Sequence, residues 1–234
     1  FIQNSFLENL GHKILFTSNQ KQESIIKKMD KTSTTIESIF DSQRGIPNTK
    51  IDFTEDGLYR ALKSTSVKKY IYDDQFQKVN TMLSTKVLQE LFLNDLLILP
   101  RTVMKLQAAL KTKNEMLIIL DRIYFLKVKP NLKTNLKYVL ALLNSKLYNF
   151  WFEYYYSSTK VRGGYFDLRG TQINSIPIFQ PTETEADKFQ ILVEKIIEQK
   201  QQGKDTTTLE AKIDELVYKL YDLTAEEIKI VEEN

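Results

Sequence analysis

The segment at residues 138–178, YVLALLNSKLYNFWFEYYYSSTKVRGGYFDLRGTQINSIPI, joins a helical pattern to an irregular loop that is rich in glycine and arginine. In its first half, apolar side chains recur three or four residues apart, which predicts an amphipathic helix. Trp151 lies on the apolar face of this helix and is expected in the core. The segment therefore predicts a buried helix that leads directly into an exposed loop.

The loop holds three of the seven glycines in the chain, Gly163, Gly164 and Gly170, beside Arg162 and Arg169. Adjacent glycines allow a backbone conformation that other residues avoid, or the close approach of another molecule. The arginines favour a negatively charged partner at this loop. The alternative is a tight turn after the helix, with Gly163 as the C-terminal cap of that helix.

Composition narrows the classes of protein to which the chain can belong. Its 234 residues suit one large domain or a domain with an appendage. The absence of cysteine excludes disulfides and thiolate metal sites, and the single histidine, His12, argues against a zinc site or a His-based catalytic triad. No apolar run is long enough to span a membrane. Because the chain begins at Phe1 without a signal-peptide pattern, we expect a cytoplasmic fragment of a longer protein.

Charge is distributed unevenly along the chain, although the formal net charge is only +3. Residues 101–169 are rich in lysine and arginine, whereas the part from Glu183 onward is rich in acidic residues. This asymmetry indicates a basic recognition region that is joined to a solvated helical end.

Short apolar or alternating runs predict a mixed scaffold before the long helix. The predicted strands are HKILFT (12–17), IESIF (36–40), KIDFT (50–54), VKKYIYD (67–73), DLLILP (95–100) and EMLIILDRIYFLKV (115–128), the last of which Asp121 and Arg122 break into two strands or a bulge. QESIIKKM (22–29) predicts a short helix, and RGIPN (44–48) predicts a turn.

The C-terminal part predicts a helical hairpin. Two apolar stripes at helical spacing flank a break at residues 201–205, and Thr224 with Glu227 forms a capping box that starts a last short helix. The fold class expected is therefore α+β. A β-rich recognition domain with an internal amphipathic helix spans residues 1–182, and a helical hairpin at 183–234 packs on that domain or on a partner.

Catalytic signatures are missing from the sequence. It contains no adjacent prolines, no glycine-rich nucleotide-binding loop and no GxSxG motif. Glu-x-Lys triplets occur only on the predicted C-terminal helices, where such spacing is ordinary surface pairing. We therefore expect a binding module without a catalytic or metal site of its own.

Several of these segments, in this order, resemble the TaqI-like C-terminal specificity domain, which is the target-recognition part of adenine-specific DNA methyltransferases and of fused restriction–modification enzymes. The core of the resemblance is LLNSKL (142–147), the tyrosines at 154–156, the Ser/Thr- and Gly-rich loop at 157–164, and INSIPI (173–178). Weaker likenesses lie at 42–48, 62–74, 96–126 and 213–233.

The resemblance implies that the chain selects a sequence in duplex DNA. It also implies a separate methyltransferase domain, in the same polypeptide or on a partner subunit, that binds S-adenosylmethionine and methylates adenine. An endonuclease with Mg²⁺ could also belong to such a protein.

Basic and amide side chains in the loops are the predicted DNA contacts, because Lys and Arg bind phosphates while Arg, Gln and Asn pair with base edges. The glycine loop supplies Lys160, Arg162, Gly163, Gly164, Tyr165 and Arg169; the segment between two apolar strands supplies Arg101, Lys105, Gln107, Lys111 and Lys113; and Arg44, Lys68 and Lys69 are weaker candidates. For the second segment, a solvated helix or hairpin is an equal alternative. For the tyrosines at 154–156, core packing is favoured over stacking on bases.

Other classes of protein stay open on the sequence alone. One is a protein-interaction or assembly subunit of a restriction–modification complex, with the C-terminal helices as its working surface. RNA binding fits the charge equally well. A stand-alone nuclease or methyltransferase is disfavoured by the missing motifs.

Overall fold

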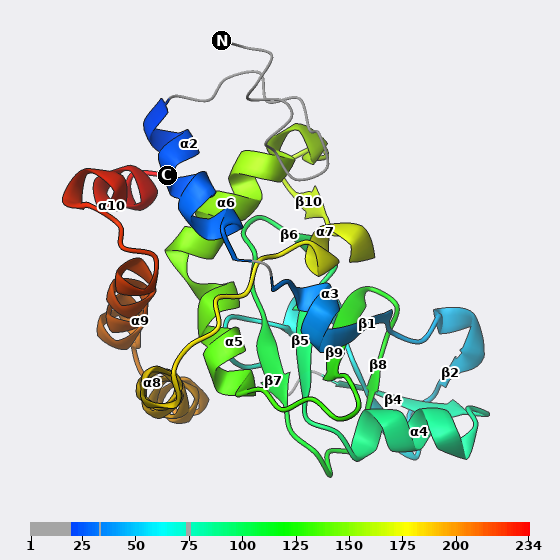
Figure 1. The fold of residues 1–234 in the computed structure, drawn as a ribbon. Coiled ribbons are helices and arrows are strands. Elements are labelled where there is room, and N and C mark those ends of the chain that lie inside the picture. Colours follow the sequence, from blue (N-terminus) through cyan, green and yellow to red (C-terminus); the bar gives the residue numbers. More distant parts are fainter. Residues whose placement is uncertain (1–19, 33, 74–75) are drawn as a thin grey trace.

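The structure, a computed structural model, describes residues 20–32, 34–73 and 76–234 of the chain. The predicted strand at 12–17 and His12 lie outside the described residues. The central element is a four-stranded antiparallel sheet in the order β1 (Phe40–Arg44), β9 (Ile123–Val128), β5 (Leu96–Pro100) and β7 (Ala109–Lys111). Figure 1 shows this sheet between a group of helices and a second, smaller lobe.

Strand β5 explains why the central sheet has a core on each side. All five residues of LLILP are buried. Because successive side chains of a strand point to opposite faces, Leu97 and Leu99 join the helical core while Leu96 and Ile98 join the core of the second lobe. A continuous apolar run is the pattern expected of a strand that is buried on both faces.

On one face of the sheet lie α5 (Leu136–Asn144) and α6 (Lys146–Tyr156), which together hold the apolar half of the segment at 138–178. The single helix predicted there forms as two helices. Ser145, in an extended conformation, separates them and caps α6, since its hydroxyl accepts a hydrogen bond from the amide of Tyr148. Trp151 is buried, as predicted.

The second lobe is a sheet in the order β2 (Ile51–Phe53), β4 (Phe76–Thr81), β3 (Tyr59–Leu62) and β8 (Leu117–Ile119), with α4 (Thr85–Phe92) beside it. Only the pair of β3 with β8 is parallel. The run at 115–128 divides at Asp121 and Arg122, as predicted, and its halves β8 and β9 enter different sheets. The turn between them therefore links the two sheets.

Two of the strand predictions are wrong. Residues Ile36–Ile39 form the short helix α3. The hydroxyl of Ser38 accepts a hydrogen bond from the amide of Thr35 and donates one to its carbonyl, which closes a turn before β1 begins. The run at 67–73 makes only isolated bridges, since Tyr70 has a φ of 74°, which interrupts an extended strand. Local alternation of side chains did not reveal either feature.

Further helices cover the outer side of α5 and α6. They are α2 (Gln20–Asp30), α8 (Glu183–Gln201), α9 (Thr207–Leu220) and α10 (Ala225–Glu232). Phe189 packs edge-on against Tyr138 with ring centroids 5.1 Å apart, and the hydroxyls of Tyr148 and Tyr221 are 2.8 Å apart. The predicted α+β class and the C-terminal helices are thus confirmed. None of the described helices is both long enough and apolar enough to cross a membrane.

Asp214 ties α9 to the start of α6, and it makes stability depend on pH. Its carboxylate is buried and accepts a hydrogen bond of 2.8 Å from the amide of Lys146. Burial raises the pKa of Asp214 to about 6. A raised pKa means that the folded state favours the protonated acid, so the contribution to stability is present below the unfolded pKa of about 4 and is lost as pH rises through 6.

We expect Asp214→Asn to raise the free energy of unfolding at pH 7 by roughly 1–3 kcal/mol and to change it much less at pH 4.5. The amide keeps the acceptor for Lys146 and removes the buried charge. Urea unfolding of both proteins at the two pH values measures the difference. Asp187→Asn, at an exposed position on α8, is the control; a gain for Asp214→Asn that is equal at both pH values contradicts the prediction.

Candidate DNA-binding interface

A row of arginines lies where the central sheet meets the glycine loop, and we call it the arginine edge. Its members come from widely separated parts of the chain and are Arg44, Arg101, Arg122, Arg162 and Arg169. Hydrogen bonds connect the segments that carry Arg44, Arg122, Arg101 and Arg169, whereas Arg162 stands on the glycine loop that leads into β10. Arg44 donates from Nε to the carbonyl of Asp121 (2.8 Å), the amide of Arg101 donates to the carbonyl of Arg122 (2.8 Å), and the amide of Leu168 donates to the carbonyl of Arg101 (2.7 Å).

A short antiparallel ladder attaches the glycine loop to this edge. Strand β10 (Phe166–Asp167) pairs with β6 (Thr102–Val103), with Phe166 opposite Val103. In this register Met104 and Lys105, which follow β6, leave the ladder at the same end as Tyr165, which precedes β10. Helix α7 (Gly170–Asn174) begins directly after Arg169, whose amide donates to the side chain of the buried Gln172 (2.9 Å).

The paired glycines form a tight turn. The amide of Gly164 donates to the carbonyl of Val161 (3.1 Å), and the amide of Val161 donates to the carbonyl of Tyr165 (2.7 Å). Gly163 and Gly164 have φ values of 86° and 80°, a region that favours glycine. The alternative is thus right about the tight turn and wrong about the helix cap at Gly163, because α6 ends at Tyr156 and a 3-10 turn at Ser157–Thr159 follows it. The amide of Gly164 is also already bonded within the turn.

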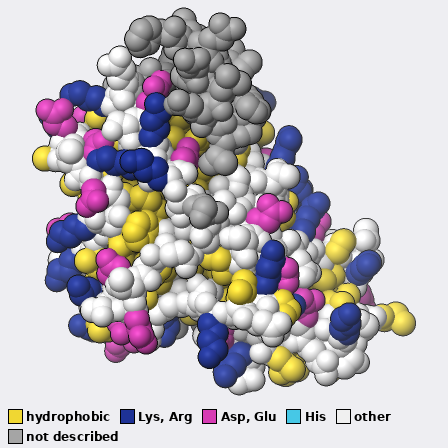
Figure 2. All heavy atoms as spheres, viewed as in Figure 1, with side chains coloured by type: hydrophobic (Ala, Val, Ile, Leu, Met, Phe, Trp, Pro, Cys, Tyr) yellow, Lys and Arg dark blue, Asp and Glu magenta, His cyan; other side chains and the backbone are white. Residues whose placement is uncertain are grey.

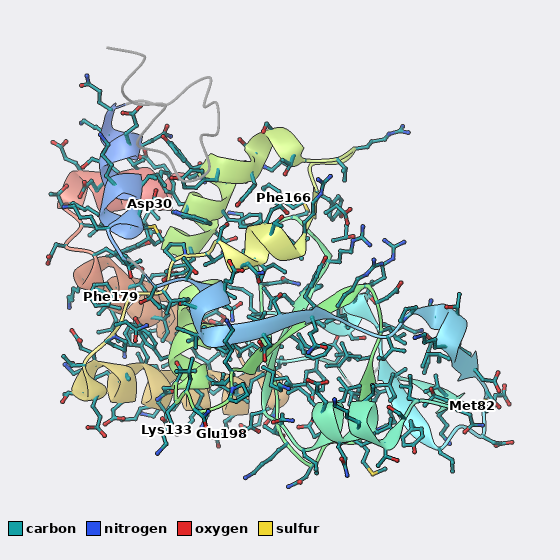
Figure 3. The ribbon with its side chains drawn as sticks, turned by 45° about the vertical axis from the view of Figure 1, so that its right-hand side comes forward. Asp30, Met82, Lys133, Phe166, Phe179 and Glu198 are labelled. Atoms are coloured by element: carbon teal, nitrogen blue, oxygen red, sulfur yellow. The ribbon has the colours of Figure 1, made fainter. Side chains whose placement is uncertain are left out.

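Phe166 anchors the loop in the core. It is buried and packs edge-on against Phe152 of α6, with ring centroids 5.1 Å apart. Figure 3 shows it between α6 and α7. Lys160 lies over the ring of Phe166, with Nζ 5.0 Å from the centroid, and also pairs with Glu153. These two contacts of Lys160 stabilise the base of the loop.

The arginines of the edge fall into two groups. Arg101 makes a bidentate ion pair with Asp167 (2.8 and 2.9 Å), which raises its pKa, and Arg44 pairs with Asp121 (3.2 Å). Arg122, Arg162 and Arg169 are exposed, and none of these three forms an ion pair with a residue that the structure describes. Figure 2 shows basic side chains, with acidic ones between them, along the side of the molecule over β10, α7 and β1. The second group leaves cationic groups free for an anionic partner.

The structure places the other predicted DNA contacts at two separate ends of the central sheet. Lys105 is exposed and joins the arginine edge, and Tyr165 is 40% exposed on the turn. Lys113 is exposed at the opposite end of β5, where its amide bonds to Asp95, and five residues of strand separate the two ends by roughly 17 Å. The predicted reading segment is therefore split between two ends of the sheet.

Three further predicted contacts already bond to other parts of the protein. The side-chain amide of Gln107 donates to the carbonyl of Val67 (2.9 Å), and Lys69 pairs with Glu210 of α9 (3.0 Å). Lys68 is exposed, and its ammonium donates to the carbonyl of Thr65. Of the tyrosines at 154–156, the second and third are buried and pack in the core, as favoured.

Lys111 is the one predicted contact that burial removes from any interface. Its residue is 0% exposed, and its ammonium donates to the carbonyl of Thr112 (3.0 Å). Burial lowers the pKa of Lys111 to about 8. Its position at the end of β7, opposite Leu96 on the face of the central sheet that turns toward the second lobe, could not be read from a locally basic sequence.

We expect Lys111→Met to leave the affinity for duplex DNA unchanged, because the ammonium cannot reach a ligand. Lys105→Met, the same substitution at an exposed position of the arginine edge, is expected to weaken binding severalfold, because it removes one phosphate-binding charge. Titration of a fluorescent duplex with both variants measures the contrast. Equal losses of affinity in the two variants would show that burial does not exclude Lys111.

Arg122 belongs to the arginine edge but is not among the DNA contacts predicted from the sequence. It was visible only as one of many basic residues between 101 and 169. The usable signal was its place in a predicted break between two apolar strands, since exposed residues in such turns often carry function.

Comparison with known proteins identifies the family. The TaqI-like C-terminal specificity domain matches residues 59–178, about half of the chain. No curated protein matches the sequence significantly. The type IIG restriction endonuclease BpuSI has a similar fold, with a TM-score of 0.54 at 10% identity over 87% of this chain and 33% of its own. The chain therefore spans about a third of that protein.

Two further solved structures, one of them the S subunit of a type I restriction–modification system, score lower. The S subunit from M. genitalium has a TM-score of 0.44 at 13% identity, covering 72% of this chain and 40% of its own. The HsdS subunit from Thermoanaerobacter tengcongensis has a TM-score of 0.41 at 9% identity, covering 86% and 50%. The family match confirms the resemblance seen in the sequence and the DNA sequence-recognition role that it implies. This chain belongs to the family of TaqI-like C-terminal specificity domains.

Proposed function

We propose that the chain recognises a sequence in duplex DNA through the arginine edge and the glycine turn beside it. The observation that carries the proposal is that three exposed arginines, unpaired with any carboxylate of the described residues, lie on one edge of a specificity domain and on the glycine loop attached to that edge. Guanidinium groups bind both phosphates and the O6/N7 edge of guanine in the major groove. Tyr165 and Lys105 extend the same surface.

The paired arginines have a supporting role in this proposal. Arg101 holds β10 against β6 through Asp167, and Arg44 holds the turn at 121–122 against β1. These contacts fix the turn that carries Arg122 and the strand that leads to Arg169 before DNA arrives. A prearranged surface loses less conformational entropy on binding.

The reaction that uses this recognition belongs to domains outside the chain. A methyltransferase domain that binds S-adenosylmethionine, in the same polypeptide or on a partner subunit, would methylate adenine in the selected sequence; an endonuclease with Mg²⁺ could act at the same sequence. To reach its target atom, a DNA methyltransferase extrudes the base from the stack. The arginine edge would supply a further contact surface that holds the duplex in register during this step.

The burial of the C-terminal helices favours a structural role for residues 183–234. It argues against the alternative that they are the docking surface of an assembly subunit. The apolar stripes of α8 and α9 are buried against this chain, at Phe189, Val193, Ile196, Ile213 and Val217. A helix face that is already covered is not available for a partner. Within the proposal, residues 1–182 are the recognition domain and the helical end packs on it.

Selection from a randomised duplex pool across a salt series tests the proposal. We expect an enriched sequence and an affinity that falls with the logarithm of salt concentration, with a slope of about −0.9 for each phosphate contact. Duplex RNA is the competitor that addresses RNA binding, and it should displace DNA poorly. A folded chain that shows no salt-dependent binding to DNA contradicts the proposal.

A further inference from the structure

We propose that Arg122 reads a base edge and sets part of the sequence preference, whereas Arg162 contacts backbone phosphates and sets affinity. This inference rests on the proposed function and divides the arginine edge into two roles. Both side chains are exposed, and neither pairs with a carboxylate in the part of the chain that the structure describes. What distinguishes them is how firmly each backbone is held.

The backbone around Arg122 is fixed from three directions. The turn closes with a bond from the amide of Ile123 to the carbonyl of Leu120 (3.0 Å), and the carbonyl of Arg122 itself accepts from Arg101 (2.8 Å). The amide of Gly45 donates to the carbonyl of Ile123 (2.9 Å). The turn thus joins β8 and β9, and Ile119 and Ile123 at its two ends are fully buried in the core between the sheets.

Close packing leaves this turn little room to shift. A Cβ atom on Gly45 would lie 2.2 Å from the carbonyl oxygen of Leu120, so the backbone of the segment after β1 touches the turn directly. Arg44 adds a bond from Nε to the carbonyl of Asp121 and an ion pair to its carboxylate. That pairing also occupies the acidic neighbour of Arg122, which leaves the guanidinium of Arg122 free.

Arg162 stands on a far less constrained turn. The backbone hydrogen bonds that close residues 161–165 run within the turn itself, and nothing lies within 4 Å of a Cβ atom placed on Gly164. Val161 and Tyr165, on either side, are 49% and 40% exposed. The guanidinium of Arg162 can therefore adjust its position to a ligand.

These two settings suit different contacts. A bidentate bond to a base edge requires a donor that is held in one place, and sites on rigid elements are more precise than sites on loops. Attraction to a phosphate depends mainly on charge and tolerates movement of the side chain. The fixed backbone at Arg122 therefore favours base reading, and the less constrained turn that carries Arg162 favours phosphate contact.

Parallel selections with the wild-type chain, Arg122→Ala and Arg162→Ala test the division. For Arg122→Ala we expect the preference at one base pair of the enriched sequence to fall by about ten- to hundredfold, with the other positions retained. For Arg162→Ala we expect the same enriched sequence, a uniform loss of affinity, and a salt slope that is smaller by about 1. Thermal melting of each variant checks that these exposed substitutions leave the fold intact.

The outcomes separate this inference from the proposed function. If the wild-type chain enriches a sequence and Arg122→Ala enriches the same one at every position, the division of roles is wrong while DNA recognition stands. If Arg162→Ala, rather than Arg122→Ala, relaxes a single position, the roles are reversed and the rigidity argument fails. A wild-type chain that enriches no sequence overturns both.

Discussion

Replacing Arg162 and Arg169 together by alanine is expected to lower the affinity for duplex DNA by about 100-fold at low salt. Hydrogen bonds to charged groups contribute roughly 1.5–3 kcal/mol each, so the removal of two such bonds amounts to at least about 3 kcal/mol. Both side chains are exposed and free of ion pairs with described residues, so their removal leaves no buried charge unpaired. The salt slope should fall by about 2, because each arginine that binds a phosphate contributes about 1 to it.

A matched double substitution controls for the change in net charge. Lys188 and Lys195 are exposed on α8, away from the arginine edge, and Lys188→Ala/Lys195→Ala removes the same two charges. Its affinity should stay close to that of the unaltered chain. If both double variants bind DNA equally weakly, binding depends on total charge and the arginine edge has no special role.

The second large effect is expected on stability, at Asn144 in the LLNSKL segment. This side chain is 1% exposed and bonds to both polar groups of Ala108: its oxygen accepts from the amide (2.9 Å), and its nitrogen donates to the carbonyl (2.9 Å). A third bond runs to the carbonyl of Leu140 (3.0 Å). Asn144 thus pairs the segment before β7 with α5 much as a neighbouring strand would.

We expect Asn144→Ala to lower the free energy of unfolding by roughly 2–4 kcal/mol. The substitution leaves the amide of the buried Ala108 without a partner, which costs about 1–3 kcal/mol, and removes one of two bonds to its carbonyl, which still accepts from the amide of Tyr70 (2.8 Å). Urea unfolding at pH 7 measures the loss. A shift that stays under about 1 kcal/mol would show that water or a rearranged backbone replaces the side chain.

Asn149, on the next helix, provides the comparison. It is half-buried, and its amide donates to one carbonyl of the same segment, that of Leu106 (3.1 Å). Asn149→Ala removes one bond to that segment and leaves no backbone amide of the segment unpaired, so we expect a loss of about 1 kcal/mol. A loss as large as that of Asn144→Ala would indicate that both positions act through helix packing alone.

The contrast between these asparagines shows how far a local pattern predicts a contact. Asn144 lies in a family motif on an apolar helix, as the sequence predicts. The sequence did not show that the helix breaks at Ser145, or that Asn144 pairs with a residue 36 positions away. Such a contact depends on which segment folds back onto the helix.

Several features of the protein could be predicted from residue types within a few positions of one another. They are the burial of β5 on both faces, the break at 121–122, the two stripes of the C-terminal helices and the capping box of Thr224 with Glu227. The order of the motifs also indicated the family. These signals could be read from the sequence because helix and strand periodicities are themselves local.

Which charges share a surface could not be predicted in this way. Strand pairing carried Arg101, Arg122 and Arg169 to one edge, although they come from separate segments, and the length of β5 placed Lys113 at the other end of the sheet. The packing of β7 buried Lys111, although the two residues that follow it, Thr112 and Lys113, are exposed. The physical reason is that side-chain exposure depends on contacts between segments that are distant in sequence, and no local pattern of charge encodes those contacts.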